Sequence, residues 1–236
     1  MPLLINIDSA TEIASVCIAV NGLPVALIKN EHQKEHASFI HAALAGLLTQ
    51  TGYNLKDIDA FAVTSGPGSY TGLRVAMATA KGLCYALSKP FIAINTLEVM
   101  TKAAIDITGK SEKDILFCPM IDARRMEVFT AIYNADIENI LSPIAIILEE
   151  NFFENYMISN RTLFFGSGSG KFRQITTNPN GVFADVQYDA RHLASLAAIA
   201  FQQKKFSDIT YAEPTYFKDF HSIKKVDKQI FPQTEI

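Results

Sequence analysis

The hydrophobic positions in the first thirty residues follow a pattern typical of β-strands. Short apolar runs rich in β-branched residues predict strands over residues 3–7, 13–20 and 25–28. Asn21 and Gly22 separate the last two strands. This pair favours a tight hairpin, because both positions of such a turn must tolerate a positive φ.

The pattern then alternates between helical and strand-like spacing. Apolar residues recur every three or four positions over residues 37–51, which predicts a helix with one apolar face. The first half continues with a strand over 59–65, a glycine-rich loop over 66–72, a helix over 73–87 and a strand over 91–95.

The second half of the chain repeats this order of elements. The predicted elements are strands over 115–121, 126–133 and 144–148, a short helix over 149–157, a strand over 162–165, a glycine loop over 166–170 and a long helix over 190–203. An acidic residue, Asp8 or Asp122, ends the first strand of each half. A Gly-x-Gly-Ser loop follows a later strand in each half. The order of elements therefore indicates an internal duplication.

The duplicated βββαβα unit predicts an α/β protein with two lobes, an arrangement similar to the actin-like ATPase (ASKHA) fold. We expect a first, partner-binding lobe over residues 1–105, a second lobe over 106–217 and a tail over 218–236. The tail carries four lysines, which would either touch a nucleic acid in an assembled complex or form a solvated tail: Lys218, Lys224, Lys225 and Lys228.

Both glycine loops lie where a nucleotide-binding protein of this fold would hold phosphate, yet neither is a P-loop. Leu73 follows Gly72, and Phe172 stands where a metal-binding hydroxyl would follow Lys171. A tight strand-to-helix turn and a weak nucleotide site both remain open. The candidate residues of these vestigial phosphate or nucleotide loops are Asp8, Thr11, Gly66, Gly68, Ser69, Thr71, Gly72, Asp122, Gly166 and Gly168.

Composition limits the classes of partner. Of the 236 residues, 49% are hydrophobic, and 21 Lys and Arg against 24 Asp and Glu give a net charge of −3. No global positive field would bind RNA or an anionic membrane unaided. Three separated cysteines fit a reducing cytoplasm, and no run is long enough to span a membrane. His32 and His36 have i, i+4 spacing without completing a ligand set, so we predict no metal site.

The helix over residues 73–87 is apolar nearly all round, which indicates burial on two sides. Its own sheet would cover one side. The other side would be covered by another subunit or by the rest of the monomer. Both alternatives remain open, and a partner interface is the favoured one.

Four motifs resemble the TsaB (also called YeaZ) family. They are Asp8-Ser9-Ala10-Thr11, the block Ser-Gly-Pro-Gly-Ser-Tyr-Thr-Gly-Leu-Arg at 65–74, Asp-Ala-Arg-Arg-x-Glu-Val-Phe at 122–129, and Glu213-Pro214-x-Tyr216. The resemblance covers residues 3–217, and the 65–74 block is its most specific part.

This resemblance implies a non-catalytic scaffold or activator that binds the transferase TsaD, together with the ATPase TsaE. The complex makes threonylcarbamoyladenosine beside the anticodon of ANN-decoding tRNAs. TsaD-type chains carry a His-x-x-x-His metal motif where this sequence has Thr96 and Met100, so the resemblance implies no metal site and no catalysis. A small-molecule kinase or ATPase of the same fold is the alternative, and a metalloprotease of the glycoprotease type is a remote one.

The resemblance also implies a homodimer when TsaD is absent, tRNA contact only through the complex, no intrinsic cofactor and at most weak ATP or ADP binding at the interface of the complex. From the apolar pattern of two first-lobe helices we expect the partner interface at Ile40, Leu44, Leu47, Arg74, Ala76, Met77, Ala80, Lys81 and Cys84.

Overall fold

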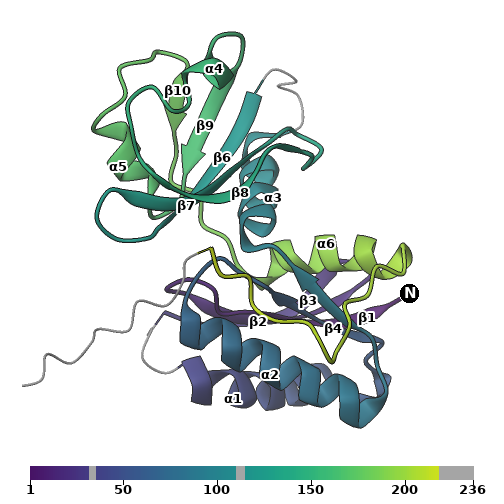
Figure 1. Cartoon of the computed structure of the whole chain (residues 1–236). Coiled ribbons are helices and arrows are strands. Elements are labelled where there is room, and N and C mark those ends of the chain that lie inside the picture. Colours follow the sequence, from purple (N-terminus) through teal and green to yellow (C-terminus); the bar gives the residue numbers. More distant parts are fainter. Residues whose placement is uncertain (32–35, 110–114, 218–236) are drawn as a thin grey trace, which may run out of the picture.

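The computed structural model describes residues 1–31, 36–109 and 115–217, which form two lobes, each built on a five-stranded sheet (Figure 1). The lysine-bearing segment 218–236 and His32 lie outside the described residues, as does the side chain of His36.

The first sheet has the strand order β3-β2-β1-β4-β5. β1 pairs antiparallel with β2 and parallel with β4. The predicted hairpin between β2 and β3 is confirmed, with φ angles of 52° at Asn21 and 80° at Gly22. The strands are β1 (Leu3–Asp8), β2 (Ala14–Val20), β3 (Leu23–Asn30), β4 (Ala60–Thr64) and β5 (Phe91–Ile94).

The second sheet repeats this topology. Its order is β10-β9-β6-β7-β8, and β6 pairs antiparallel with β7 and parallel with β9, just as β1 pairs with β2 and β4. The predicted duplication and the two-lobed α/β class are therefore confirmed. The strands are β6 (Ile115–Asp122), β7 (Glu127–Tyr133), β8 (Asn139–Ile147), β9 (Arg161–Phe165) and β10 (Gly181–Phe183).

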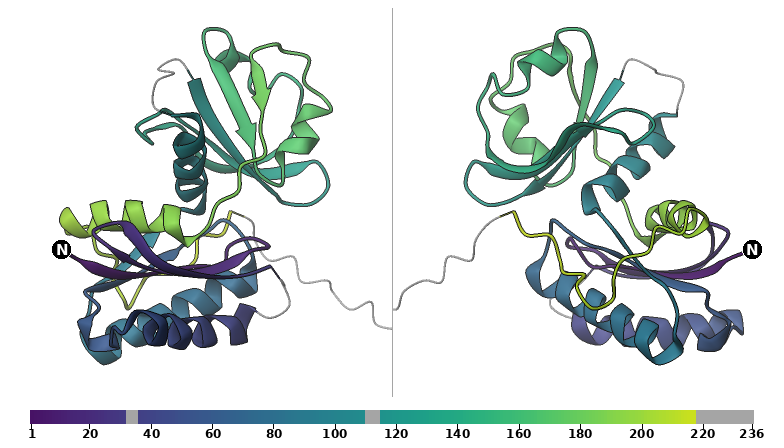
Figure 2. Two further views of the ribbon diagram at one scale, coloured as in Figure 1. Left: turned by 180° about the vertical axis from the view of Figure 1, so that it is seen from behind. Right: turned by 45° about the vertical axis from the view of Figure 1, so that its right-hand side comes forward.

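The helices lie in three layers (Figures 1 and 2). α1 (His36–Thr51) and α2 (Tyr70–Leu87) cover the outer face of the first sheet. α3 (Thr96–Thr108) and α6 (Ala190–Gln202) lie between the two lobes. The short helices α4 (Glu154–Met157) and α5 (Ser169–Arg173) lie on the second sheet, and a 3₁₀ turn (Leu55–Asp57) precedes β4.

Helix boundaries differ from the prediction where capping side chains set them. α2 starts three residues early because the Ser69 hydroxyl accepts a hydrogen bond from the Gly72 amide (3.3 Å). α3 was not predicted, and the Asn95 side chain caps it. The helix expected over 149–157 is confined to α4, and the Phe153 ring that precedes α4 is fully buried in the core of the second lobe.

The chain returns to the first lobe at its C-terminal end. α6 packs on the inner face of the first sheet, and residues 203–217, which we call the C-terminal strap, cross β5 and α2. Within the range 106–217 that we expect to form the second lobe, the second sheet is followed by α6 and the strap, which pack on the first lobe. One core joins both lobes, with Leu4, Leu97, Phe117 and Leu193 in a single cluster.

Candidate functional site

The first glycine loop packs directly against the turn that follows β1. A Cβ atom at Gly68 would lie 2.2 Å from the Ala10 carbonyl oxygen, and one at Gly72 would lie 2.0 Å from the Ser9 carbonyl oxygen. The Ser69 amide donates to the Ala10 oxygen (2.6 Å), and the Ser9 hydroxyl donates to the Gly72 carbonyl (2.7 Å). Glycine is therefore required here for close approach of two backbones, and the Ser69 amide is already engaged.

The second glycine loop also packs closely against the backbone of the first strand of its lobe, β6. Gly166 has a φ of 89°, and a Cβ atom there would lie 2.5 Å from the Met120 carbonyl oxygen. The Gly168 amide donates to that same oxygen (3.0 Å), and the Ser169 amide donates to the Gly166 carbonyl (3.1 Å). Both loops are thus tight strand-to-helix turns.

The two matched aspartates have opposite environments. Asp8 is 1% exposed, and its Oδ1 accepts hydrogen bonds from the Thr64 hydroxyl (2.7 Å) and the Ala10 amide (3.2 Å). Its Oδ2 has no hydrogen-bond partner among the described residues. Burial raises the pKa of Asp8 from its ordinary value of 3.8 to about 6.

Asp122 is exposed and paired. Its Oδ1 accepts a hydrogen bond from the Lys171 Nζ (2.7 Å), and this bond lowers the pKa of the Asp122 carboxyl. In residues 1–31, 36–109 and 115–217, no three His, Cys, Asp or Glu side chains are grouped so that they could hold a metal ion.

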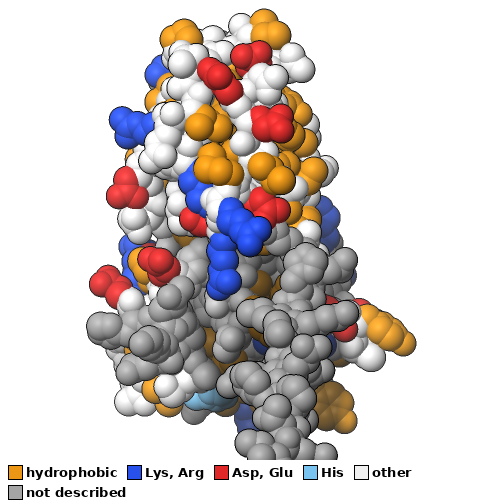
Figure 3. All heavy atoms as spheres, turned by 60° about the vertical axis from the view of Figure 1, so that its left-hand side comes forward, with side chains coloured by type: hydrophobic (Ala, Val, Ile, Leu, Met, Phe, Trp, Pro, Cys, Tyr) orange, Lys and Arg blue, Asp and Glu red, His pale blue; other side chains and the backbone are white. Residues whose placement is uncertain are grey.

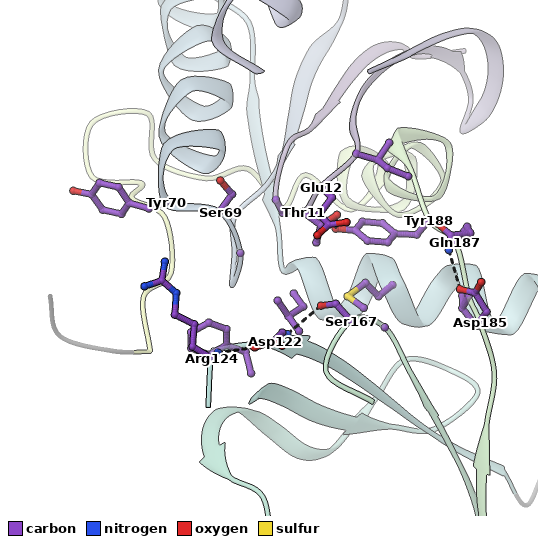
Figure 4. A pocket seen from close by; sticks show the side chains of 18 residues that line it. Thr11, Glu12, Ser69, Tyr70, Asp122, Arg124, Ser167, Asp185, Gln187 and Tyr188 are labelled. Carbon is purple, nitrogen blue, oxygen red and sulfur yellow. Dashed lines mark hydrogen bonds between the residues drawn. The ribbon is translucent and has the colours of Figure 1, made fainter. Parts of the chain in front are cut away.

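A cleft of about 980 Å³ lies between the lobes. Thr11, Ser69 and Ser167 line it, and each hydroxyl oxygen accepts a bond from the protein: from the Tyr188 hydroxyl (3.0 Å), the Gly72 amide (3.3 Å) and the Asp122 amide (3.0 Å). Each hydroxyl therefore keeps its own proton to donate. Figure 4 places Arg124 and Tyr70 at one end of the cleft and Asp185 and Gln187 at the other.

Sequence reasoning gave no role to Tyr188, Arg124 or Tyr70 in this cleft. Arg124 and Tyr70 stand inside quoted motifs, so their positions carried a signal. Tyr188 lies in an irregular segment without a recognisable pattern, and only the fold brings it beside Thr11.

Thr96 and Met100, which stand where TsaD-type chains carry the metal-binding histidines, have packing roles. The buried Thr96 hydroxyl accepts a hydrogen bond from the Gly66 amide (3.1 Å), which fixes the first glycine loop. Met100 is 3% exposed, and its methyl group lies close to Gly166 of the second loop. Each side chain thus supports one of the two loops.

Most of the residues predicted to meet a partner are buried in the first lobe's own core. Their side chains pack against the first sheet, which corrects the predicted surface: Ile40, Leu44, Leu47, Ala76, Met77, Ala80 and Cys84. Of the other two, Lys81 donates to the Ala212 carbonyl of the strap (2.9 Å), and Arg74 is exposed. Thr71, predicted as a loop residue, lies exposed in the first turn of α2.

The opposite face of α1 and α2 is exposed and built of small residues. It comprises Ala42, Ala45, Ala78, Gly82 and Ala86. A Cβ atom at Gly82 would meet nothing within 4 Å, and the neighbouring Tyr85 is 83% exposed. We call these residues, with Tyr85, the small-residue face.

An aromatic cluster holds the strap onto α2. The Arg74 guanidinium lies 4.1 Å from the Tyr70 ring centroid, and its Nε donates to the Tyr216 hydroxyl (3.1 Å). The Tyr70 and Tyr216 rings are 5.3 Å apart. At the end of the strap, the Phe217 ring lies 6.1 Å from Phe129 of the second lobe.

Among the described residues, no helix is both long enough and apolar enough to cross a membrane.

The family model of TsaD, tRNA N6-adenosine threonylcarbamoyltransferase, matches residues 28–233. The chain is also 28% identical over 234 residues to the tRNA threonylcarbamoyladenosine biosynthesis protein TsaB of Escherichia coli, which covers 94% of this chain and 97% of that protein.

The solved structure of YeaZ from Pseudomonas aeruginosa matches with a TM-score of 0.78 at 25% identity, over 92% of this chain and 100% of the other. Similarity to the tRNA N6-adenosine threonylcarbamoyltransferase of Novosphingobium aromaticivorans is 42% over 65 residues, which is 28% of this chain and 19% of the enzyme. Likeness to TsaB and YeaZ thus extends over both lobes, whereas likeness to that enzyme is local.

Proposed function

Because the chain belongs to the TsaD (tRNA N6-adenosine threonylcarbamoyltransferase) family, and within it to the TsaB (YeaZ) proteins of tRNA threonylcarbamoyladenosine biosynthesis, we propose that it is the non-catalytic partner of the transferase. In this role it binds TsaD, works with TsaE, and reaches tRNA through the complex.

The small-residue face carries this proposal. Small side chains allow another helix pair to approach closely, and the exposed Tyr85 ring supplies apolar area at the edge. The same face would pair two copies of the chain when the transferase is absent. Because a shared core holds the two lobes together, the face is presented on a rigid support.

The cofactor proposal follows from the glycine loops. Their close packing on the turns after β1 and β6 supports a chain with no intrinsic cofactor. Any ATP or ADP would bind weakly, at the interface of the complex. Calorimetric titration with ATP and Mg²⁺ tests this, because tight binding to the isolated chain would favour the kinase or ATPase alternative.

The docking test uses Ala78→Glu and Gly82→Glu in the small-residue face. Both positions are exposed in the single chain, so each variant should fold and keep the thermal stability of the monomer. Covering the new carboxylate without a partner charge should weaken binding of the transferase by about a hundredfold or more. Co-purification and calorimetry with the purified transferase measure this loss.

Ile199→Glu in α6 is the matched control, since Ile199 is 50% exposed on a helix at the opposite face of the first sheet. It should bind the transferase like the wild-type chain. Equal binding by Gly82→Glu and wild type would refute the docking surface. Ala76→Glu is unsuitable, because Ala76 is fully buried and the variant would lose stability.

Reconstituted tRNA modification tests the role itself. With the transferase, TsaE, the threonylcarbamoyl-adenylate donor and an ANN-decoding tRNA, omission of this chain should abolish most product. Undiminished product without it would contradict the proposal.

A further inference from the structure

The turn between β6 and β7 places arginines where the backbone disfavours them. Arg124 and Arg125 have φ angles of 71° and 49°, both in the left-handed region. Bulky side chains rarely adopt this region, which favours Gly and Asn. The β2–β3 hairpin of the same chain meets the same requirement with Asn21 and Gly22. The turn itself therefore does not explain two arginines.

The turn is held by backbone and Asp122 contacts, not by the arginine side chains. The Arg124 amide donates to Asp122 Oδ1 (2.6 Å), and the Glu127 amide donates to the Arg124 carbonyl (3.0 Å). Both arginine side chains are exposed, and neither has an ion pair or hydrogen bond to another described residue. An unfavourable backbone that presents side chains with no partner among the described residues points to a function for those side chains.

On the first-lobe side of the cleft, Tyr70 contacts a third arginine and a second tyrosine. Arg124 and Tyr70 line the same cleft, and Figure 4 shows the Arg124 side chain directed toward the side on which Tyr70 lies. Tyr70 stacks with Arg74 and Tyr216, and all three side chains are at least partly exposed. We call Arg124, Arg125, Arg74, Tyr70 and Tyr216 the arginine rim.

The charge of the rim is local. In the space-filling view, a few Lys and Arg side chains lie together near the end of the second lobe that faces the first lobe, with Asp and Glu side chains beside them (Figure 3). The nearby Asp122 carboxylate is neutralised by Lys171, and Figure 4 places Glu12 and Asp185 away from the Arg124 end of the cleft. With a net charge of −3, the whole chain would not attract a polyanion on its own.

We propose that the arginine rim binds a single-stranded segment of RNA that the partner protein brings to it. Guanidinium groups bind phosphate oxygens, and exposed tyrosine rings are surfaces on which unpaired bases stack. Tyr70 and Tyr216 also hold the strap onto α2, and the exposed parts of their rings leave area on which a base can stack. The proposal rests on the proposed function, since the RNA arrives with the transferase.

The test replaces the two arginines with the residues that their turn prefers. Arg124→Asn/Arg125→Gly should raise the melting temperature by about 2–4 °C, because the left-handed positions are relieved. In the complex with the transferase, the same variant should bind an ANN-decoding tRNA transcript about tenfold more weakly. The slope of log K against log salt should fall by about 1.4, which corresponds to two single-strand phosphate contacts.

Lys204→Asn is the matched control. Lys204 is exposed with a φ of 54° at the end of α6, away from the cleft, so the variant also removes one charge and one left-handed strain. It should gain stability and leave tRNA affinity unchanged. Size-exclusion chromatography first establishes that each variant still forms the complex, so a failure of docking is separated from a failure of RNA binding.

Unchanged tRNA affinity in the Arg124→Asn/Arg125→Gly complex would overturn the proposal. Loss of transferase binding in that variant would also overturn it, because the rim would then be a protein interface. If the wild-type chain forms no complex, the proposed function fails, and the rim, which needs the transferase to bring the RNA, fails with it. Where the complex forms, ultraviolet cross-linking of the complex to tRNA gives a second measurement. Cross-links at Tyr70 or Tyr216 that the double variant loses would support the rim, and their absence in the wild type would overturn it.

Discussion

Replacing Asp8 by asparagine should remove a pH dependence of folding stability. The Asp8 carboxyl is buried, and burial raises its pKa from 3.8 to about 6. An acid with a raised pKa in the folded state stabilises the fold when protonated, so its contribution is complete below pH 3.8 and is lost as the pH rises through 6. The shift corresponds to about 3 kcal/mol in total, and to about 2 kcal/mol between pH 7.5 and pH 4.5.

Urea unfolding at several pH values between 4.5 and 7.5 measures this term. Other groups also titrate in this window: burial raises the pKa of Glu98 and lowers the pKa of His192. The contributions of Glu98 and His192 cancel in the difference in unfolding free energy between wild type and Asp8→Asn. This difference should change by about 2 kcal/mol in favour of the variant as the pH rises.

Thr64→Val provides an internal check on Asp8. The Thr64 hydroxyl donates to the carboxylate and so favours its charged form. Its removal should raise the pKa of Asp8 further and move the stability transition to higher pH. Parallel curves for wild type and Asp8→Asn across the whole window would refute the reasoning.

Three further predictions follow from single contacts. Gly72→Ala should destabilise the chain by about 2 kcal/mol or more in thermal unfolding, because its Cβ would lie 2.0 Å from a carbonyl oxygen, whereas Gly82→Ala in the open part of α2 should stabilise it by up to about 1 kcal/mol. Asp189→Asn should lower the free energy of unfolding in urea by about 2 kcal/mol near pH 7 and by progressively less below pH 4. The reason is that hydrogen bonds from Arg191 and Lys29 hold the pKa of the Asp189 carboxyl below its usual range. An equal loss of stability at pH 3 would contradict this. Lys171→Ala should raise the pKa of the Asp122 carboxyl toward its ordinary value in an NMR titration, and an unmoved pKa would show that the ion pair does not form in solution.

Periodicity and turn chemistry predicted much of the architecture. The alternation of strands and helices and the Asn21-Gly22 hairpin are local properties, and the structure confirms both. The return of α6 to the first sheet could not be predicted, because its amphipathic pattern shows that one face is buried but not on which sheet. The same ambiguity explains the interface prediction. α2 has apolar residues on two sides. Ala76 and Ala80 pack against the sheet, whereas Ala78 and Gly82 remain exposed.

The candidate site shows a second limit of sequence reasoning. A glycine-rich loop between a strand and a helix fits both an anion cradle and a close backbone approach, and only the position of Ser9 and Ala10 in the fold shows that the close approach is present. The left-handed arginines carry no periodic signal at all. Their conformation depends on the closure of the β6–β7 turn, which the sequence does not reveal.

The return of the C-terminal end to the first sheet makes the two lobes inseparable as folding units. A chain cut between Gly109 and Ile115 would leave the N-terminal fragment without α6 and the strap, and its sheet would expose apolar surface that the second fragment normally covers. Neither fragment would be a domain, although the sequence divides neatly into two similar halves. The two pieces should instead fold only on mixing, so that fragment complementation, not domain dissection, is the way to study how this protein assembles.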